Sequence, residues 1–170
     1  MNGLSDAADL DAALLALRVV VGVLMAMHGM QKLFGLFGGG GLAGTAGWFS
    51  SLGFKHGRTA AMLAGIGEIA GGLGLAAGLL TAASAAVFIA VMTTAAIVNH
   101  ADGGFWSVSK GWELNLYLMV IAGFVAAAGP GRWSLDAALD LTAYGAVHAA
   151  VSAVAGVIAG SLTWVLRRRI

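Results

Sequence analysis

The segment Ala82 to Asn99, AASAAVFIAVMTTAAIVN, contains no charged residue and decides the fold class. A helix needs about 20 mainly apolar residues to cross the hydrocarbon core of a bilayer. Comparable apolar stretches lie on both sides of it, at about 13–36, 58–80, 112–128 and 143–166. The sequence therefore predicts an all-α, polytopic membrane protein with a four-helix transmembrane bundle and a fifth, C-terminal transmembrane helix.

The composition supports the same class. Of the 170 residues, 59% are hydrophobic and 10% are charged, and the mean hydropathy is +0.90. The formal charge of +1 leaves no basic excess to neutralise a phosphate backbone, so nucleic acid is not an expected partner. The chain has no cysteine, which excludes disulfides, iron–sulfur ligation and a thiol nucleophile. A redox role would therefore need a redox centre supplied from elsewhere.

We divide the chain into three regions. Residues 1–12 form an acidic N-terminal segment, residues 13–136 the membrane core with spans at 13–36, 58–80, 82–99 and 112–128, and residues 137–170 a linker, the fifth span and a basic tail. The connection 37–57 fits a short interfacial helix or lid, or alternatively a plain hydrophobic loop. Only Thr81 separates the span 58–80 from the span 82–99. Because this connection is so short, the second and third spans must be antiparallel neighbours.

The basic residues gather on one side of the membrane. Five alternating spans place seven of the nine Lys and Arg residues on the side of the first and third loops and the C-terminus, which we call the basic side: Lys32, Lys55, Arg58, Lys110, Arg167, Arg168 and Arg169. The opposite, acidic side carries Asp6, Asp9, Asp11, Asp136 and Asp140 with Arg18 and Arg132. The positive-inside rule predicts a cell-membrane protein with a cytoplasmic C-terminus.

Ionisable residues inside a bilayer are costly and therefore mark candidate functional sites. The alternation of spans brings five of them towards the basic side, and these are the candidate catalytic residues: His28, Lys32, Glu68, His100 and Glu113. His28 and Lys32 are four residues apart and share a helix face. Candidate ligand-binding residues are His28, Lys32, Glu68 and Asn115, and no metal site is predicted.

Several chemistries suit this cluster. The side chains could shuttle protons, because histidine titrates near neutral pH. They could also bind the two oxygens of a quinone between apolar walls. Alternatively, His28 and His100 could ligate haem iron. In the structural alternative, Lys32 and Glu68 neutralise each other and His28 is hydrogen-bonded in the core.

Small residues and a polar segment on the acidic side are expected to serve packing. Gly67 and Gly71, Gly74 and Gly78, and Gly156 and Gly160 have the four-residue spacing that lets helix backbones touch. Gly72 leaves room for a ligand or for a neighbouring backbone. Arg132 and Asp136 are expected to form a structural clasp, with Ser134 capping the following turn and Arg18 partnering Asp136 or Asp11.

Three strings in order resemble the DoxX family of bacterial and archaeal membrane proteins. They are His28-Gly29-Met30-Gln31-Lys32, then Glu68 followed by Gly71-Gly72, then Gly129-Pro130-Gly131-Arg132-Trp133-Ser134-Leu135-Asp136. The resemblance covers about Leu17 to Asp136 and implies a four-helix membrane core linked to redox chemistry. Some relatives are the small membrane subunit of a thiosulfate:quinone oxidoreductase, and others are associated with oxidative stress and thiol homeostasis. The fifth span departs from this pattern.

Three functions follow as hypotheses. The first is a membrane redox subunit that handles quinone or protons with a peripheral oxidoreductase, in sulfur-compound oxidation or oxidative-stress defence. The alternative is a non-catalytic scaffold that docks redox or detoxification enzymes at the bilayer, as a monomer or a homo-oligomer. A small-solute or proton transporter is the third, although the spans lack the inverted repeats and proline-broken helices of such machines.

Overall fold

The computed structural model describes residues 3–169, which form helices joined by short turns. The helices are α1 (Gly3–Phe34), α2 (Gly41–Ser51), α3 (Gly57–Ala77), α4 (Thr81–Ala95), α5 (Glu113–Ala128), α6 (Leu135–Ala138) and α7 (Ala146–Val165). Four single turns complete the chain: η1 (Leu36–Gly38), η2 (Ala96–His100), η3 (Ala101–Gly103) and η4 (Ser107–Ser109). No strand occurs in the described chain, so the predicted all-α class is confirmed.

Four helical segments are long and apolar enough to cross a membrane: Ala7–Phe34, Gly57–Ala77, Thr81–Gly103 and Ala146–Val165. The chain is therefore a multi-pass membrane protein. The exception is α5, which has 16 residues. At 1.5 Å per residue it is about 24 Å long, shorter than the roughly 30 Å hydrocarbon core. The predicted fifth span is one of the four long helices, whereas the predicted fourth span is the short one.

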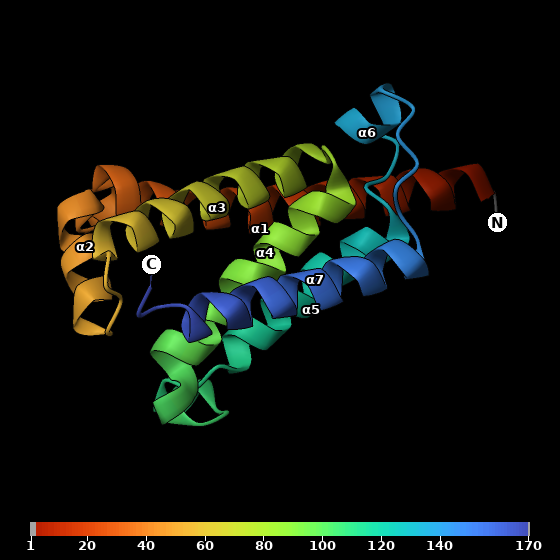
Figure 1. The fold of residues 1–170 in the computed structure, drawn as a ribbon. Helices are drawn as coiled ribbons and strands as arrows, with labels where there is room; N and C mark the ends of the chain where they lie inside the picture. The colour runs from red at the N-terminus through yellow and green to blue at the C-terminus, as the bar shows by residue number, and fades with distance from the viewer. Residues whose placement is uncertain (1–2, 170) are drawn as a thin grey trace.

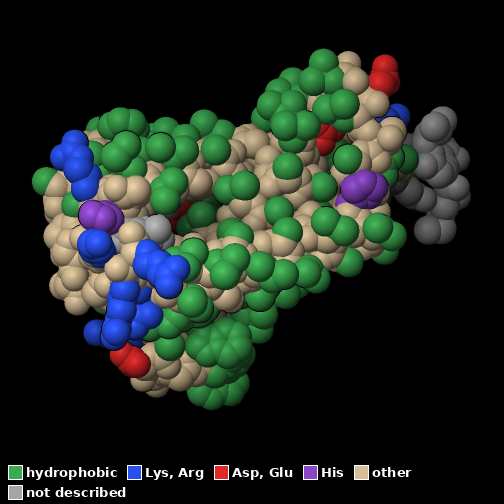
Figure 2. Space-filling model, in the orientation of Figure 1, with side chains coloured by type: hydrophobic (Ala, Val, Ile, Leu, Met, Phe, Trp, Pro, Cys, Tyr) green, Lys and Arg blue, Asp and Glu red, His purple; other side chains and the backbone are tan. Residues whose placement is uncertain are grey.

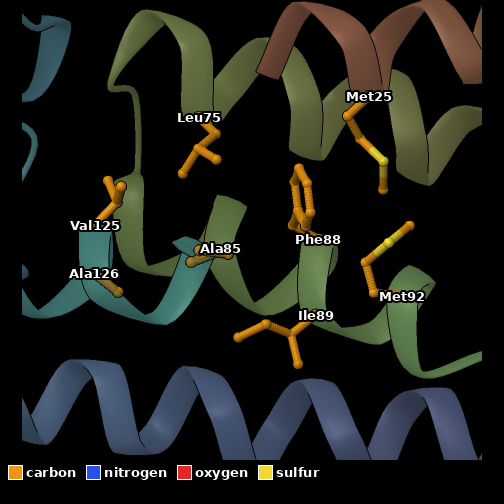
Figure 3. Close-up of a cluster of buried hydrophobic side chains, with 9 residues drawn as sticks. Met25, Leu75, Ala85, Phe88, Ile89, Met92, Val125 and Ala126 are labelled. Carbon is orange, nitrogen blue, oxygen red and sulfur yellow. The ribbon is translucent and has the colours of Figure 1, made fainter. Parts of the chain in front are cut away.

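The helices form two layers that diverge towards the basic side (Figure 1). One layer is the antiparallel pair of α1 and α3, and the other contains α4, α5 and α7. α4 links the layers because it packs against α3, α5 and α7. The core lies where the layers converge, and its side chains include Met25, Leu75, Phe88 and Val125 (Figure 3). The half of the molecule nearer the basic side is consequently less completely filled.

Close backbone contact holds each layer together. A Cβ atom added to Gly72 of α3 would lie 2.5 Å from the carbonyl oxygen of Gly22 in α1. Such contact requires small residues. The resulting van der Waals packing holds membrane helices together, because lipid provides no hydrophobic driving force between them. Gly156 of α7 faces the α4 backbone in the same way. Gly72 thus makes room for a neighbouring backbone, one of its two predicted roles.

The segment 37–57 forms the helix α2, one of the two alternatives predicted for it. Phe49 of α2 is buried together with Phe54 and with Ala60 and Ala61 of α3. The Thr45 hydroxyl also donates a hydrogen bond of 3.1 Å to the carbonyl oxygen of Lys32. α2 therefore packs across the ends of α1 and α3 on the basic side.

Polar contacts hold the helix ends together on the acidic side, as predicted for the structural clasp. The residues that pair differ from the predicted ones. Arg132 pairs with Asp11 at 2.6 Å. The Asp136 carboxylate accepts hydrogen bonds from the amides of Leu80 and Thr81, at 2.7 and 2.8 Å, at the start of α4. The buried Arg18 donates to the carbonyl oxygens of two other residues, Ala76 at 2.9 Å and Trp133 at 2.8 Å, and forms no ion pair with either carboxylate within the described residues.

A local prediction for the same segment is confirmed. The Ser134 hydroxyl accepts a hydrogen bond of 3.2 Å from the amide of Ala137 and so caps the short helix α6.

Candidate functional site

A cavity of about 640 Å³ lies between the two diverging layers, in the half nearer the basic side. Its walls are mainly apolar and come from α1, α3, α4, α5 and α7, with Trp48 and Phe49 of α2 at one end. Met25, Phe88 and Met92 belong both to the hydrophobic core and to the cavity wall. Six residues with polar side chains of potential chemical importance also line it: His28, Lys32, Glu68, Asn99, His100 and Asn115.

Lys32 and Glu68 form an ion pair on the wall made by α1 and α3. The Lys32 ammonium donates to both carboxylate oxygens of Glu68, at 2.5 and 2.7 Å. The Glu68 side chain is 5% exposed and that of Lys32 is 24% exposed. Glu68 lies eleven residues into α3, about 16 Å along its axis. The antiparallel packing of α1 and α3 brings these two distant residues together.

His28 faces the cavity one turn from Lys32, and its hydrogen bonds define its tautomer. The Gln31 amide nitrogen donates to the carbonyl oxygen of Phe37 at 3.1 Å, so the Gln31 Oε1 atom points to His28. That oxygen lies 2.9 Å from His28 Nδ1, which must therefore carry a hydrogen. In the neutral ring, Nε2 is then the acceptor and has no hydrogen bond within the described part of the chain, and His28 is exposed rather than buried in the core.

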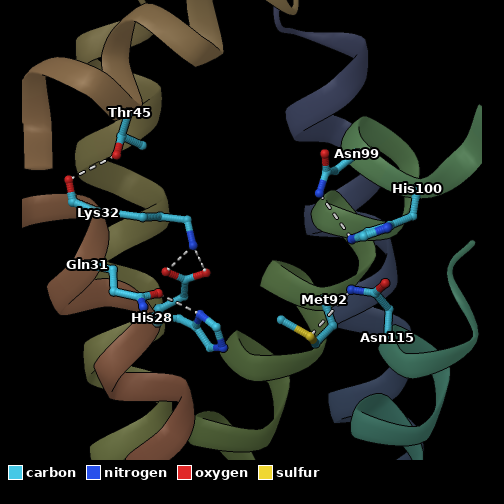
Figure 4. A network of polar contacts seen from close by, with 9 residues as sticks. His28, Gln31, Lys32, Thr45, Met92, Asn99, His100 and Asn115 are labelled. Carbon is cyan, nitrogen blue, oxygen red and sulfur yellow. Dashed lines mark hydrogen bonds and ion pairs between the residues drawn. The ribbon is translucent and has the colours of Figure 1, made fainter. Parts of the chain in front are cut away.

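The opposite wall carries a second polar group, formed where α4 continues into the π-helical turn η2 (Figure 4). His100 Nδ1 lies 2.8 Å from the carbonyl oxygen of Lys110, and its Nε2 lies 3.1 Å from the Asn99 amide nitrogen. Nearby, among the described residues, the buried Asn115 amide donates only to the Met92 sulfur, at 3.7 Å. A thioether is a weak acceptor, so Asn115 retains donor capacity towards the cavity.

The structure separates Glu113 from the other candidate residues. Its carboxylate accepts hydrogen bonds from the Ser107 amide at 3.0 Å and from the Tyr117 hydroxyl at 2.8 Å. Glu113 is absent from the cavity wall, because it stands at the first residue of α5 and turns towards the preceding loop. His28, Lys32, Glu68, His100 and Asn115 all line the cavity.

The sequence pattern assigns no role to Gln31 or Asn99, which form hydrogen bonds with the two histidines. The three-residue spacing of Gln31 from His28 was the available signal for the first. Asn99 adjoins His100, but its contact depends on the π turn, which local periodicity does not predict. Both ring nitrogens of His100 are engaged in hydrogen bonds, an arrangement that does not suit the ligation of haem iron by His28 and His100.

Fold and cavity together define a multi-pass helical membrane protein with a mainly apolar cavity that carries polar side chains. The DoxX family model matches residues 13–101, slightly more than half of the chain. The chain belongs to the DoxX family. The match contains His28, Lys32, Glu68 and His100, while Asn115 lies beyond it. No curated protein and no solved structure matches the chain.

Proposed function

We propose that this DoxX-family protein is the membrane subunit of a quinone-linked oxidoreductase and that its cavity holds the quinone ring. The observation that carries the proposal is the presence of polar groups on two opposite walls of an apolar cavity inside the membrane. A quinone has two carbonyl oxygens at opposite ends of an apolar ring. The polar pattern of the cavity matches that of the ligand.

The size and lining of the cavity fit such a ring. Its volume of about 640 Å³ is within the range of roughly 300–1,000 Å³ that is typical of small-molecule sites. Trp48, Phe49 and Phe88 supply flat aromatic surfaces. The exposed lining residues Leu24 of α1 and Leu63 of α3 show that the cavity reaches the lipid-facing surface. An apolar tail could therefore extend from the ring into the bilayer.

Each polar side chain of the cavity then has a defined role towards the quinone ring. Bound quinone would supply the electron-accepting chemistry, at two electrons and two protons per ring. His28 Nε2 takes up or releases a proton at one ring oxygen, with Nδ1 held by Gln31. Lys32 uses two ammonium hydrogens for Glu68 and has a third for the ligand. Asn115 donates from the opposite wall.

The remaining parts of the proposal concern partner and location. The chain has no cysteine, so the electrons come through the redox centre of a peripheral oxidoreductase, in sulfur-compound oxidation or oxidative-stress defence. The protein resides in the cell membrane, with the basic side and the C-terminus in the cytoplasm. The wide end of the cavity, next to α2, then faces the cytoplasmic leaflet.

Titration of the purified protein with decylubiquinone, followed by tryptophan fluorescence, tests the proposal. Trp48 lines the cavity, whereas Trp133 lies in the clasp on the acidic side. We expect saturable quenching that is largely lost in Trp48→Phe and kept in Trp133→Phe. Linear, unsaturable quenching that both variants share would contradict a quinone site and favour the non-catalytic scaffold.

A further inference from the structure

We propose that the opening between α3 and α7 is a binding site for one anionic phospholipid, whose headgroup contacts the basic residues at the ends of these helices and whose acyl chain lies in the groove. The site opens from the same cavity as the proposed quinone site, but its headgroup contacts lie outside that cavity and it does not depend on the quinone proposal. It is the mouth through which the cavity opens sideways to lipid.

The groove follows from the way α4 packs. α4 contacts both α3 and α7, but α3 and α7 make almost no contact with each other within the described chain. Cavity-lining residues therefore come from both sides of the opening: Leu63 and Gly67 of α3, and Ala159 and Thr163 of α7. The space-filling view shows the surface hollowed between these helices (Figure 2). Leu63 is 59% exposed, so the groove reaches the membrane-facing surface.

Basic residues gather at one end of this groove (Figure 2). The amide of Lys55, just before α3, donates to the carbonyl oxygen of Arg167, just after α7, at 2.9 Å. This bond brings together five basic residues: Lys55, Arg58, Arg167, Arg168 and Arg169. Between residues 3 and 169, none of the five pairs with an acidic side chain. The cluster therefore carries uncompensated positive charge at the headgroup level.

The length of the groove matches one acyl chain. From Arg58 to Gly67 is nine residues, about 14 Å of helix, and from Arg167 back to Ala159 is eight residues, about 12 Å. Half of a roughly 30 Å hydrocarbon core is about 15 Å. A lipid with its phosphate at the arginines would thus place its chain along the whole groove.

The positive charge of the basic cluster and the apolar lining of the groove together indicate which ligand binds there. The basic cluster favours an anionic headgroup, since each basic residue near a membrane surface attracts acidic lipid. The groove begins beside that cluster and continues into the bilayer, where an acyl chain fills it and an acidic protein surface does not. A phospholipid such as phosphatidylglycerol has both parts.

Native mass spectrometry of the full-length protein in neutral detergent tests the site. We expect one phosphatidylglycerol retained per chain, with at least a tenfold preference over phosphatidylcholine of the same acyl chains. Arg58→Gln and Arg169→Gln should each weaken retention about fivefold. Lys110→Gln removes the same charge from a loop on the same side of the membrane and should leave retention unchanged. Ala159→Phe fills the groove without altering charge and should also weaken it.

The outcomes are distinct. Equal retention of both lipids, or an equal loss in Lys110→Gln, would overturn the proposal. So would undiminished binding in Ala159→Phe, or inorganic phosphate binding as tightly as the lipid, because either would show that the groove contributes nothing. Thermal unfolding of each variant checks that weakened retention reflects the site rather than misfolding. A quinone titration that fails while lipid is retained would refute the proposed function alone.

Discussion

Lys32 and Glu68 are the residues on which the cavity wall depends. The Glu68 side chain is almost completely buried, and its carboxylate oxygens accept two hydrogen bonds from Lys32. A buried pair of this kind contributes little net stability compared with apolar residues, but removing one partner strands a buried charge. The pair therefore gives opposite expectations for single and double substitutions.

We expect Lys32→Met to lower the free energy of unfolding by roughly 3–5 kcal/mol, because Glu68 remains buried without its partner. The double variant Lys32→Met with Glu68→Leu should return to within about 1 kcal/mol of the wild type. Thermal unfolding in detergent measures both. Additive losses in the double variant would show that the pair is not energetically coupled.

Gln31 is a positioning residue for His28. Gln31→Leu removes the acceptor of the His28 Nδ1 hydrogen, so the ring is no longer held with Nε2 towards the cavity. We expect decylubiquinone to bind about fivefold more weakly, equivalent to about 1 kcal/mol for one hydrogen bond. Fluorescence titration measures the affinity. Gln31→Glu keeps an acceptor and should retain most of it, so an equal loss in both variants would contradict the positioning role.

Among the elements, α3 packs against α1 and α4 and also forms part of the cavity wall. Gly65 and Gly72 face α1, Gly67 and Gly71 face α4, and Glu68 lies between these surfaces on the cavity wall. The α3 backbone approaches α1 where Gly65 meets Gly29 and where Gly72 meets Gly22, so these two contacts are seven residues, or two turns of helix, apart, whereas the four-residue pair faces α4. The absence of side chains on two faces lets α3 fit between α1 and α4 while still presenting a carboxylate.

Gly72→Ala should destabilise this packing. A Cβ atom there would lie 2.5 Å from the Gly22 carbonyl oxygen and 2.7 Å from the Ala26 amide nitrogen. Overpacking of this kind costs about 1–3 kcal/mol. Gly123→Ala in α5 is the matched control, because its Cβ meets nothing within 4 Å and the helix should gain up to about 1 kcal/mol. Equal thermal stability of the two variants would refute the backbone contact.

The whole molecule is closed at one end and open at the other. On the acidic side, Asp11, Arg18 and Asp136 tie the segment after α5 to α1 and to the turn between α3 and α4. Towards the basic side the layers diverge around the cavity. Stability and ligand binding should therefore respond to substitutions at opposite ends.

Asp136→Ala tests this separation. The substitution removes the acceptor of two amide hydrogen bonds at the start of α4, which we expect to cost about 2–3 kcal/mol. Asp136→Asn keeps one oxygen and should lose about half as much. Decylubiquinone affinity, measured by titration at a temperature where each variant is folded, should stay within about twofold of the wild type. A parallel loss of affinity would show that the two ends are coupled.

The orientation in the membrane can be tested directly, because the chain has no cysteine. Ser109→Cys places a thiol on the basic side and Thr142→Cys places one on the acidic side. A membrane-impermeant maleimide added to intact cells should label Thr142→Cys, and should label Ser109→Cys only after lysis. The reverse pattern would overturn the predicted cytoplasmic C-terminus.

The class of protein and the approximate positions of its long helices follow from the sequence alone. Whether a segment enters lipid depends on its own length and composition, so the uncharged run 82–99 and its neighbours could be identified without tertiary information. The alternation of spans also anticipated that Lys32 and Glu68 would lie towards the same side of the membrane. Both inferences rest on local properties and on the order of the segments along the chain.

Which side chains meet depends on how the helices pack in three dimensions. Glu113 turns away from the cavity, Gln31 orients His28, and Arg132 rather than Arg18 pairs with Asp11. These partnerships depend on the rotation of each helix about its axis and on the angle at which the layers diverge. Nearly every helix face in this chain is apolar, so the pattern of apolar residues does not determine the helix rotations or the angle between the layers. The packing of small residues sets them instead.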